Sequence, residues 1–207
     1  MRFRLGFLRR PAAGFRPSRL AWPLLAAGLL AGCGSLSAPP QTFDLRAPDM
    51  VKPARPGRAQ LVIAEPTALQ ALDSDRILVR SGDGQVSYLP AAQWSDRLPN
   101  LVQARLIQTF ENADRIGSVG RPSDKLTPDA TLVADIRDFE IQAGGAATAV
   151  VAISAKIVSE STGRIVAAQV FSASVPAGVT GPQASAALDQ AMQTVLREIV
   201  TWASSRI

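Results

Sequence analysis

One cysteine stands where a chemical modification is expected. Cys33 follows Leu30, Ala31 and Gly32, and these residues close an apolar run that extends from Leu20 to Ala31. Small residues before a cysteine fit the cleft of a signal peptidase, and the thiol is the nucleophile that takes up a diacylglyceryl group. The pattern predicts that Cys33 is lipidated with acyl chains such as palmitate. The alternative is an unmodified cysteine that happens to follow an apolar segment.

The segment before Cys33 has the order of a secretory signal peptide. Its arginines, with no acidic residue among them, are Arg2, Arg4, Arg9, Arg10, Arg16 and Arg19. The apolar run that follows is 12 residues long and contains Pro23, whereas a membrane-spanning helix needs about 20 residues. Residues 1–32 are therefore predicted to be a lipoprotein signal peptide.

Cleavage before Cys33 would leave 207 − 32 = 175 residues, enough for one domain with a sizeable core. The chain has 22 basic and 17 acidic residues, but six basic ones lie in the signal, so the remainder carries 16 − 17 = −1. A nearly neutral domain argues against a nucleic acid partner. Because Cys33 is the only cysteine, no disulfide forms within the chain and the fold must rest on its core.

The residue types argue against an enzyme. The sequence has no histidine, which removes the commonest general base and the commonest transition-metal ligand. The three lysines are Lys52, Lys125 and Lys156, and no serine nucleophile motif accompanies them. Two carboxylate pairs, Asp73/Asp75 and Asp135/Asp138, are expected to be solvated or ion-paired rather than to serve as acid/base or cation sites. No catalytic residue, metal or cofactor is predicted.

A glycine-rich stretch, Ser81 to Gly84, is interpreted as a turn. It is too short for a phosphate-binding loop and lacks the lysine and the following helix of that motif. Two runs rich in β-forming residues, 76–80 and 85–89, flank it. This arrangement predicts a β-hairpin.

The elements that position these residues begin after a proline-rich stretch. Residues 33–58 are predicted to be a lipidated tether, interrupted by a short edge strand at 41–45. The folded domain is predicted to cover residues 59–207 and to begin with a buried strand at 60–64. Apolar residues at three- and four-residue spacing from Leu98 to Phe110 predict an amphipathic helix, with a short strand at 116–119 after it.

The second half of the domain alternates apolar and polar residues. In 131–142 the alternation changes phase near Arg137-Asp138, which predicts a β-bulge there. Residues 148–157 and 164–175 predict a second hairpin. A capping box at Thr180 to Gln183 precedes an amphipathic helix that runs to about Ser204. The expected fold is therefore α+β, with a mainly antiparallel sheet and two amphipathic helices packed on one face.

Residues 76–106 resemble the ABC-type transport auxiliary lipoprotein family. The resemblance consists of a strand that contains Tyr88, then Trp94, a proline and a leucine-rich helix. The lipobox, the tether, the later strands and the terminal helix follow in the family's order. Membership would imply a non-catalytic lipoprotein that accompanies an ABC permease and ATPase and a mammalian-cell-entry (MCE) domain protein. Such systems move lipids between the two membranes of a cell envelope.

The resemblance raises two further expectations. Tyr88 and Trp94 are candidate residues of a partner interface, because aromatic side chains dominate binding hot spots; the alternative is that both pack between hairpin and helix. Gly34 follows the lipidated cysteine where an aspartate would retain a lipoprotein in the inner membrane, so we expect attachment to the inner leaflet of the outer membrane.

Other functions remain open at this point. One alternative is a periplasmic module that itself binds a lipid or solute, and a second is a structural lipoprotein of outer-membrane assembly. The sequence does not decide whether the chain forms a homo-oligomer. It also does not name the transported lipid, the direction of transport or the docking surface.

Overall fold

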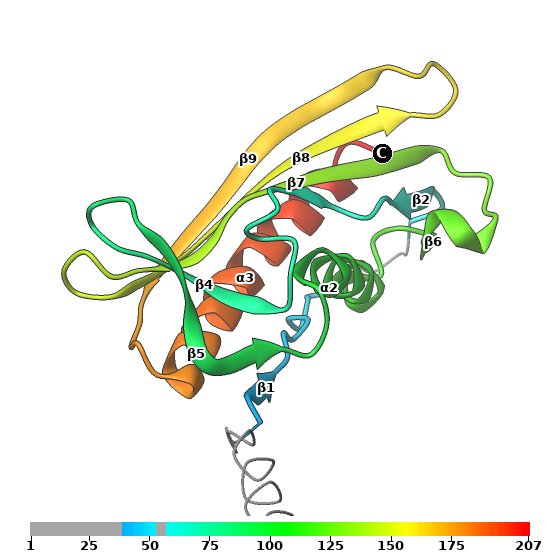
Figure 1. Cartoon of the computed structure of the whole chain (residues 1–207). Coiled ribbons are helices and arrows are strands. Elements are labelled where there is room, and N and C mark those ends of the chain that lie inside the picture. The colour runs from blue at the N-terminus through cyan, green and yellow to red at the C-terminus, as the bar shows by residue number, and fades with distance from the viewer. Residues whose placement is uncertain (1–38, 53–56) are drawn as a thin grey trace, which may run out of the picture. The chain divides into compact units, whose positions relative to one another are not determined.

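A computed structural model of the protein describes residues 39–52 and 57–207, drawn in Figure 1. The elements are β1 (Gln41–Phe43), β2 (Gln60–Ile63), β3 (Thr67–Ala68), β4 (Arg76–Arg80), β5 (Val86–Trp94), α2 (Leu98–Ala113), β6 (Ser118–Gly120), a 3-10 turn η1 (Pro122–Asp124), β7 (Ala130–Gln142), β8 (Thr148–Ser159), β9 (Ile165–Pro176) and α3 (Gly181–Ser204). The predicted signal peptide and Cys33 lie outside the described residues.

Strand β7 is the centre of the sheet. One edge of β7 pairs in parallel with β2, then β3, then β4, which follow one another along its length. The other edge pairs antiparallel with β8, and β8 pairs antiparallel with β9. Beyond β4 the sheet continues to β5 and β1, and beyond β2 it continues to β6. The resulting sheet is strongly curled (Figure 1).

The expectation of a mainly antiparallel sheet is wrong, because the sheet is mixed. Among the described residues, five strand pairs run parallel, namely β1–β5, β2–β6, β2–β7, β3–β7 and β4–β7. Three pairs run antiparallel, namely β4–β5, β7–β8 and β8–β9. Each antiparallel pair joins two strands that follow one another directly in the chain. The parallel partners of β7 arise because α2 lies in the crossover between β5 and β7, and hairpin patterns do not reveal that connection.

The predicted irregularity in β7 is confirmed. Ile136 lies opposite Ile153, but Asp138 lies opposite Ala152, so Arg137 is the extra residue of a bulge. The bulge resets the alternation, and the apolar residues on both sides of it are therefore buried on one face. Both predicted hairpins also form, with positive φ angles at Gly84 and Gly163 in their turns.

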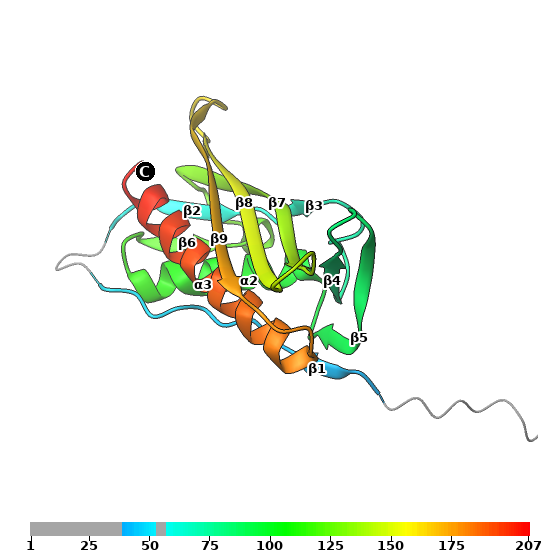
Figure 2. The same cartoon turned by 90° about the vertical axis from the view of Figure 1, so that its left-hand side faces the viewer.

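The two described helices begin near prolines and bury one stripe each. Helix α2 has Pro99 in its first turn, and the chain leaves it through Asp114 in the left-handed conformation. Helix α3 crosses β8 and β9 (Figure 2), and its fully buried residues include Leu188, Met192, Val195, Leu196 and Ile199. The predicted capping box does not form, since Thr180 bonds the side chain of Gln183 instead of the backbone.

Part of the proline-rich stretch belongs to the folded unit, which extends from Pro39 to Ile207. The predicted edge strand forms as β1 and pairs with the end of β5. Leu45 is 1 % exposed, and Asp44 accepts a 2.7 Å bond from Arg105 on α2. Residues 39–52 therefore pack on the domain. The folded unit begins at Pro39, whereas the proline content predicts a start at residue 59. Prolines exclude a helix there, but they do not exclude an extended segment that buries side chains.

Candidate partner-binding surface

Trp94, one of the two candidate interface residues, lies in the core. Its side chain is 2 % exposed, and its ring meets Phe139 edge to face with centroids 5.7 Å apart. Ala91, which follows Pro90 in β5, has a φ angle of +53°. The residues after it, Ala92 to Trp94, pair with β1. Core packing accounts for this tryptophan, and it offers a partner almost no surface.

Tyr88 lies half-buried on β5. Its hydroxyl donates a 3.3 Å hydrogen bond to the carbonyl of Ala71, and the Arg76 guanidinium lies 4.0 Å from the ring centroid. The cation over the ring and the hydroxyl bond fix the side chain against the loop that precedes β4. Tyr88 keeps some accessible surface, and its role in partner binding stays a prediction.

One carboxylate of each sequence pair, Asp73 and Asp135, holds local structure. Asp73 accepts a 2.9 Å bond from Arg97 Nε, and this bond raises the pKa of the exposed Arg97. Asp135 accepts a 2.9 Å bond from the Thr67 hydroxyl, which links β7 to β3. Within the described residues, no group of three or more acidic, histidine or cysteine side chains is placed to hold a metal ion.

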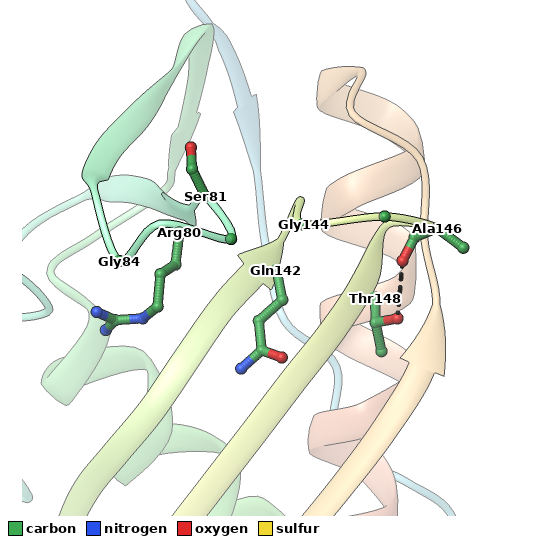
Figure 3. A pocket seen from close by; sticks show the side chains of 9 residues that line it. Arg80, Ser81, Gly84, Gln142, Gly144, Ala146 and Thr148 are labelled. Carbon is green, nitrogen blue, oxygen red and sulfur yellow. Dashed lines mark hydrogen bonds between the residues drawn. The ribbon is translucent and has the colours of Figure 1, made fainter.

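The two hairpin tips beside β4 and β7 touch through glycines, and they line a hollow of about 430 Å³ (Figure 3). A Cβ added to Gly144 would lie 2.8 Å from the Cα of Gly82, so neither position admits a side chain without movement. Arg80 lines this hollow, and its guanidinium forms a bidentate pair with Glu140, at 2.7 and 2.8 Å. Glu140 is 1 % exposed, so the pair is a structural link between β4 and β7.

Strand β9 forms a free border of the sheet, a feature that the sequence analysis does not identify. Among the described strands it pairs with β8 alone, and no described backbone group outside that pairing bonds to its outer edge between Ile165 and Pro176. The strand contains no charged residue. Its large exposed apolar residues are Ile165, Val166 and Val170, which are 57, 55 and 47 % exposed. A long, uncharged edge of this kind is a template for another strand.

A groove of about 540 Å³ lies between β9 and the last turns of α3. Phe171 of β9 and Trp202 of α3 line it, with ring centroids 5.4 Å apart in an edge-to-face contact. Phe171 is only 3 % exposed, so the half-buried Trp202 supplies most of the accessible aromatic surface. Arg115, Arg197 and Glu198 line it as well. The Nε of Arg115 is buried and has no hydrogen-bond partner among the described residues. The groove therefore combines aromatic side chains with a small excess of positive charge, beside the free edge of β9.

A sequence model of the family described as ABC-type transport auxiliary lipoprotein component matches residues 43–200. The chain belongs to this family. The match confirms the resemblance found in residues 76–106 and extends over nearly all of the folded unit. The description of this family is that of an auxiliary lipoprotein component of ABC-type transport.

The auxiliary lipoprotein is similar to an uncharacterised protein of Bradyrhizobium diazoefficiens, with 37 % identity over 185 residues. The alignment covers 84 % of this chain and 49 % of the relative, so the chain spans about half the length of the curated relative that it matches.

Two solved structures share the fold of this auxiliary lipoprotein. A protein of Xanthomonas campestris has 26 % identity and a TM-score of 0.73, covering 80 % of this chain and 96 % of its own. A second, uncharacterised protein has 15 % identity and a TM-score of 0.62, covering 80 % of this chain and 99 % of its own. Neither helix in the described part of the chain is long and apolar enough to cross a membrane.

Proposed function

We propose that the chain is a non-catalytic subunit of an MCE-type lipid transport system, held on a membrane by acyl chains on Cys33. The family match over residues 43–200 is the observation that carries this proposal. The partners are an MCE-domain protein and the ABC permease and ATPase, which the family resemblance implies. Two or more acyl chains suffice for stable anchoring, since each buried methylene contributes about 0.8 kcal/mol.

The packing of the domain favours docking over cargo binding. A module that carries a lipid needs a concave apolar pocket, of about 300–1,000 Å³ for a drug-sized ligand, that encloses most of the ligand. In this chain the helices α2 and α3 fill the space inside the curled sheet with side chains. The two hollows described above lie at hairpin tips and at a sheet edge, where they are open to solvent.

The packed segment before β2 limits how far the domain stands from the bilayer. Only five residues lie between Cys33 and Pro39, where the folded unit begins, so six Cα-to-Cα steps connect the two. Because an extended chain spans at most about 3.5 Å per residue, this linker reaches roughly 20 Å. The domain therefore works close to the membrane surface. Gly34 in place of an aspartate favours the inner leaflet of the outer membrane as that surface.

The test is recovery of partners from detergent-solubilised envelopes, using the full chain with an affinity tag and mass spectrometry. The wild type is expected to recover an MCE-domain protein together with the permease or ATPase. Cys33→Ser removes the acyl chains and is expected to lose these partners, because the domain is no longer concentrated at the membrane.

Gly34→Asp serves as the matched control, since it keeps the cysteine and changes only the sorting residue. It is expected to stay lipidated and to move to the inner-membrane fraction of a density gradient. Recovery of no transporter component by the wild type, together with lipid bound to the purified chain, would replace this proposal with the cargo-binding alternative. Wild type already in the inner-membrane fraction would overturn the proposed location.

A further inference from the structure

We infer that β9 receives an extended segment of a partner protein as an added strand, and that this segment places an apolar side chain and a carboxylate at the Phe171–Trp202 groove. The inference deepens the proposed function, on which it rests for the transporter identity of the partner. It names the docking edge and the chemistry of the segment that binds there.

The backbone of β9 is the first part of the argument. Natural edge strands are usually protected by charges, prolines, bulges or short length. The one irregularity in β9 is at its start, where Ile165 lies opposite Val158 and Ala167 opposite Ile157, which leaves Val166 as an extra residue. From Ala167 to Pro176 the strand keeps its register with β8 and carries no charge. Its outer edge therefore offers a regular row of main-chain donors and acceptors.

The side chains beside that edge provide the second part. Successive strand residues point to opposite faces, so Val170 lies on one face of β9 and Phe171 lies on the other, towards α3. A strand added to this edge would place alternate side chains beside Val170 and over the groove formed with Trp202. Main-chain bonds combined with a pocket for alternate side chains are the usual basis of recognition by strand addition.

The charges select the occupant. Arg115 and Arg197 line the groove, and neither belongs to an ion pair among the described residues. Glu198 lines it too and offsets one of these charges. A carboxylate on the added segment would complement the remaining charge. Strand β9 of a second copy contains no acidic residue, so an added β9 would bring no carboxylate of its own to the groove. A segment of another protein fits better.

Photo-crosslinking in intact envelopes tests the contact directly. The full chain carries benzoylphenylalanine at Val170, or at Val179 as the control, a residue that is 58 % exposed but lies beyond the end of the strand. The Val170 position is expected to crosslink to a segment of a transporter component that contains an apolar residue and an acidic residue close together. Val179 is not expected to crosslink to that segment. A crosslink from Val170 only to a second copy of the chain, or to no protein, would overturn the inference.

Variants of the edge and the groove test the chemistry. Val170→Lys and Arg197→Glu are each expected to lower partner recovery by about tenfold or more, as losses at binding hot spots do. Their controls are Val179→Lys and Arg206→Glu, which carry the same changes at exposed positions outside the strand and the groove. Circular dichroism checks that all four chains fold.

The outcomes separate the two proposals. If the wild type and Val170→Lys recover the transporter equally well, strand addition at β9 is wrong and the proposed function stands. If Val170 crosslinks to an apolar and acidic segment of an envelope protein unrelated to ABC transport, strand addition stands and the proposed function is wrong.

Discussion

Arg46 and Asp189 lie 143 residues apart in the chain and meet through two hydrogen bonds. The amide of Arg46 donates to Asp189 Oδ1 at 2.8 Å, and its Nε donates to Oδ2 at 3.0 Å. Asp189 is 4 % exposed on α3. The contact fastens the segment that follows the proposed lipidation site to α3, the longer of the two described α-helices.

Asp189→Ala is expected to lower the free energy of unfolding by about 1–3 kcal/mol, because it leaves a backbone amide and a guanidinium without their acceptor. It should also expose residues 39–52 to limited proteolysis. The control is Glu65→Ala, which removes an exposed pair with Arg97 at 3.4 Å and should cost less than about 1 kcal/mol. Urea denaturation measures both, and equal losses would contradict the anchoring role of Asp189.

Trp94→Ala is expected to destabilise the domain by about 3–5 kcal/mol, since it opens a cavity beside Phe139 in the core. Tyr88→Phe removes only the bond to the Ala71 carbonyl and should cost about 0.5–1.5 kcal/mol. Thermal unfolding of the two variants distinguishes core packing from surface placement. A small loss in Trp94→Ala would mean that this side chain is not part of the core.

Deletion of Arg137 is expected to turn the bulge into regular strand and to keep Phe139 and Ile141 buried. Asp138 would then directly follow Ile136, and the register with β8 would be continuous, with Phe139 still opposite Val151. We therefore expect a loss of stability well below the roughly 1.5–3 kcal/mol that exposure of one such side chain would cost. Arg137→Ala keeps the residue count and replaces an exposed side chain, so we expect nearly wild-type stability. Chemical denaturation of both variants is the measurement, and a deletion variant that loses several kcal/mol would contradict the assignment of Arg137 as the extra residue.

The Asp44 carboxylate is expected to make stability fall at acid pH. Burial by itself raises its pKa, but the hydrogen bond and positive charge of Arg105 and the amide of Leu45 outweigh this and lower the pKa below its ordinary value. A group with a lowered folded-state pKa contributes stability above the unfolded pKa of about 3.9 and loses it as the pH falls through the folded value.

Asp44→Asn therefore should be less stable than the wild type at pH 7, by less than about 1 kcal/mol because the side chain is half exposed. The difference should shrink as the pH falls below about 4. Urea denaturation at pH 7 and at low pH checks this. A difference that grows towards acid pH would have the wrong sign for an ion pair with Arg105.

Several structural elements are predictable from local patterns of residue types in the sequence. The β7 bulge was predictable because the burial period of a strand is two, and one extra residue near Arg137 changes its phase. The turns at Gly84 and Gly163 and the stripes of α2 and α3 follow for the same reason, since each depends on residues close together in the chain. The family resemblance around Tyr88 and Trp94 was likewise readable from residue types and their order.

The docking features were not predictable in this way. A strand at a free edge and a strand with neighbours on both sides show similar apolar residues, so the sequence of β9 does not reveal which one it is. Arg115, Phe171 and Trp202 are 31 to 87 residues apart in pairs, and no motif connects them. Their common groove exists only because α3 crosses the sheet beside β9.

The sequence by itself determined the signal peptide pattern, the lipidation motif at Cys33, the hairpins and the helices, because each of these depends on residues close together in the chain. Only the tertiary structure decided that Trp94 is buried, that residues 39–52 pack on the domain, and that β7 takes parallel partners. These outcomes depend on which segments, far apart in the sequence, bury their apolar side chains against one another. That choice is made by packing around α2 and α3, and it leaves the outer edge of β9 without a partner strand in the part of the chain that the structure describes.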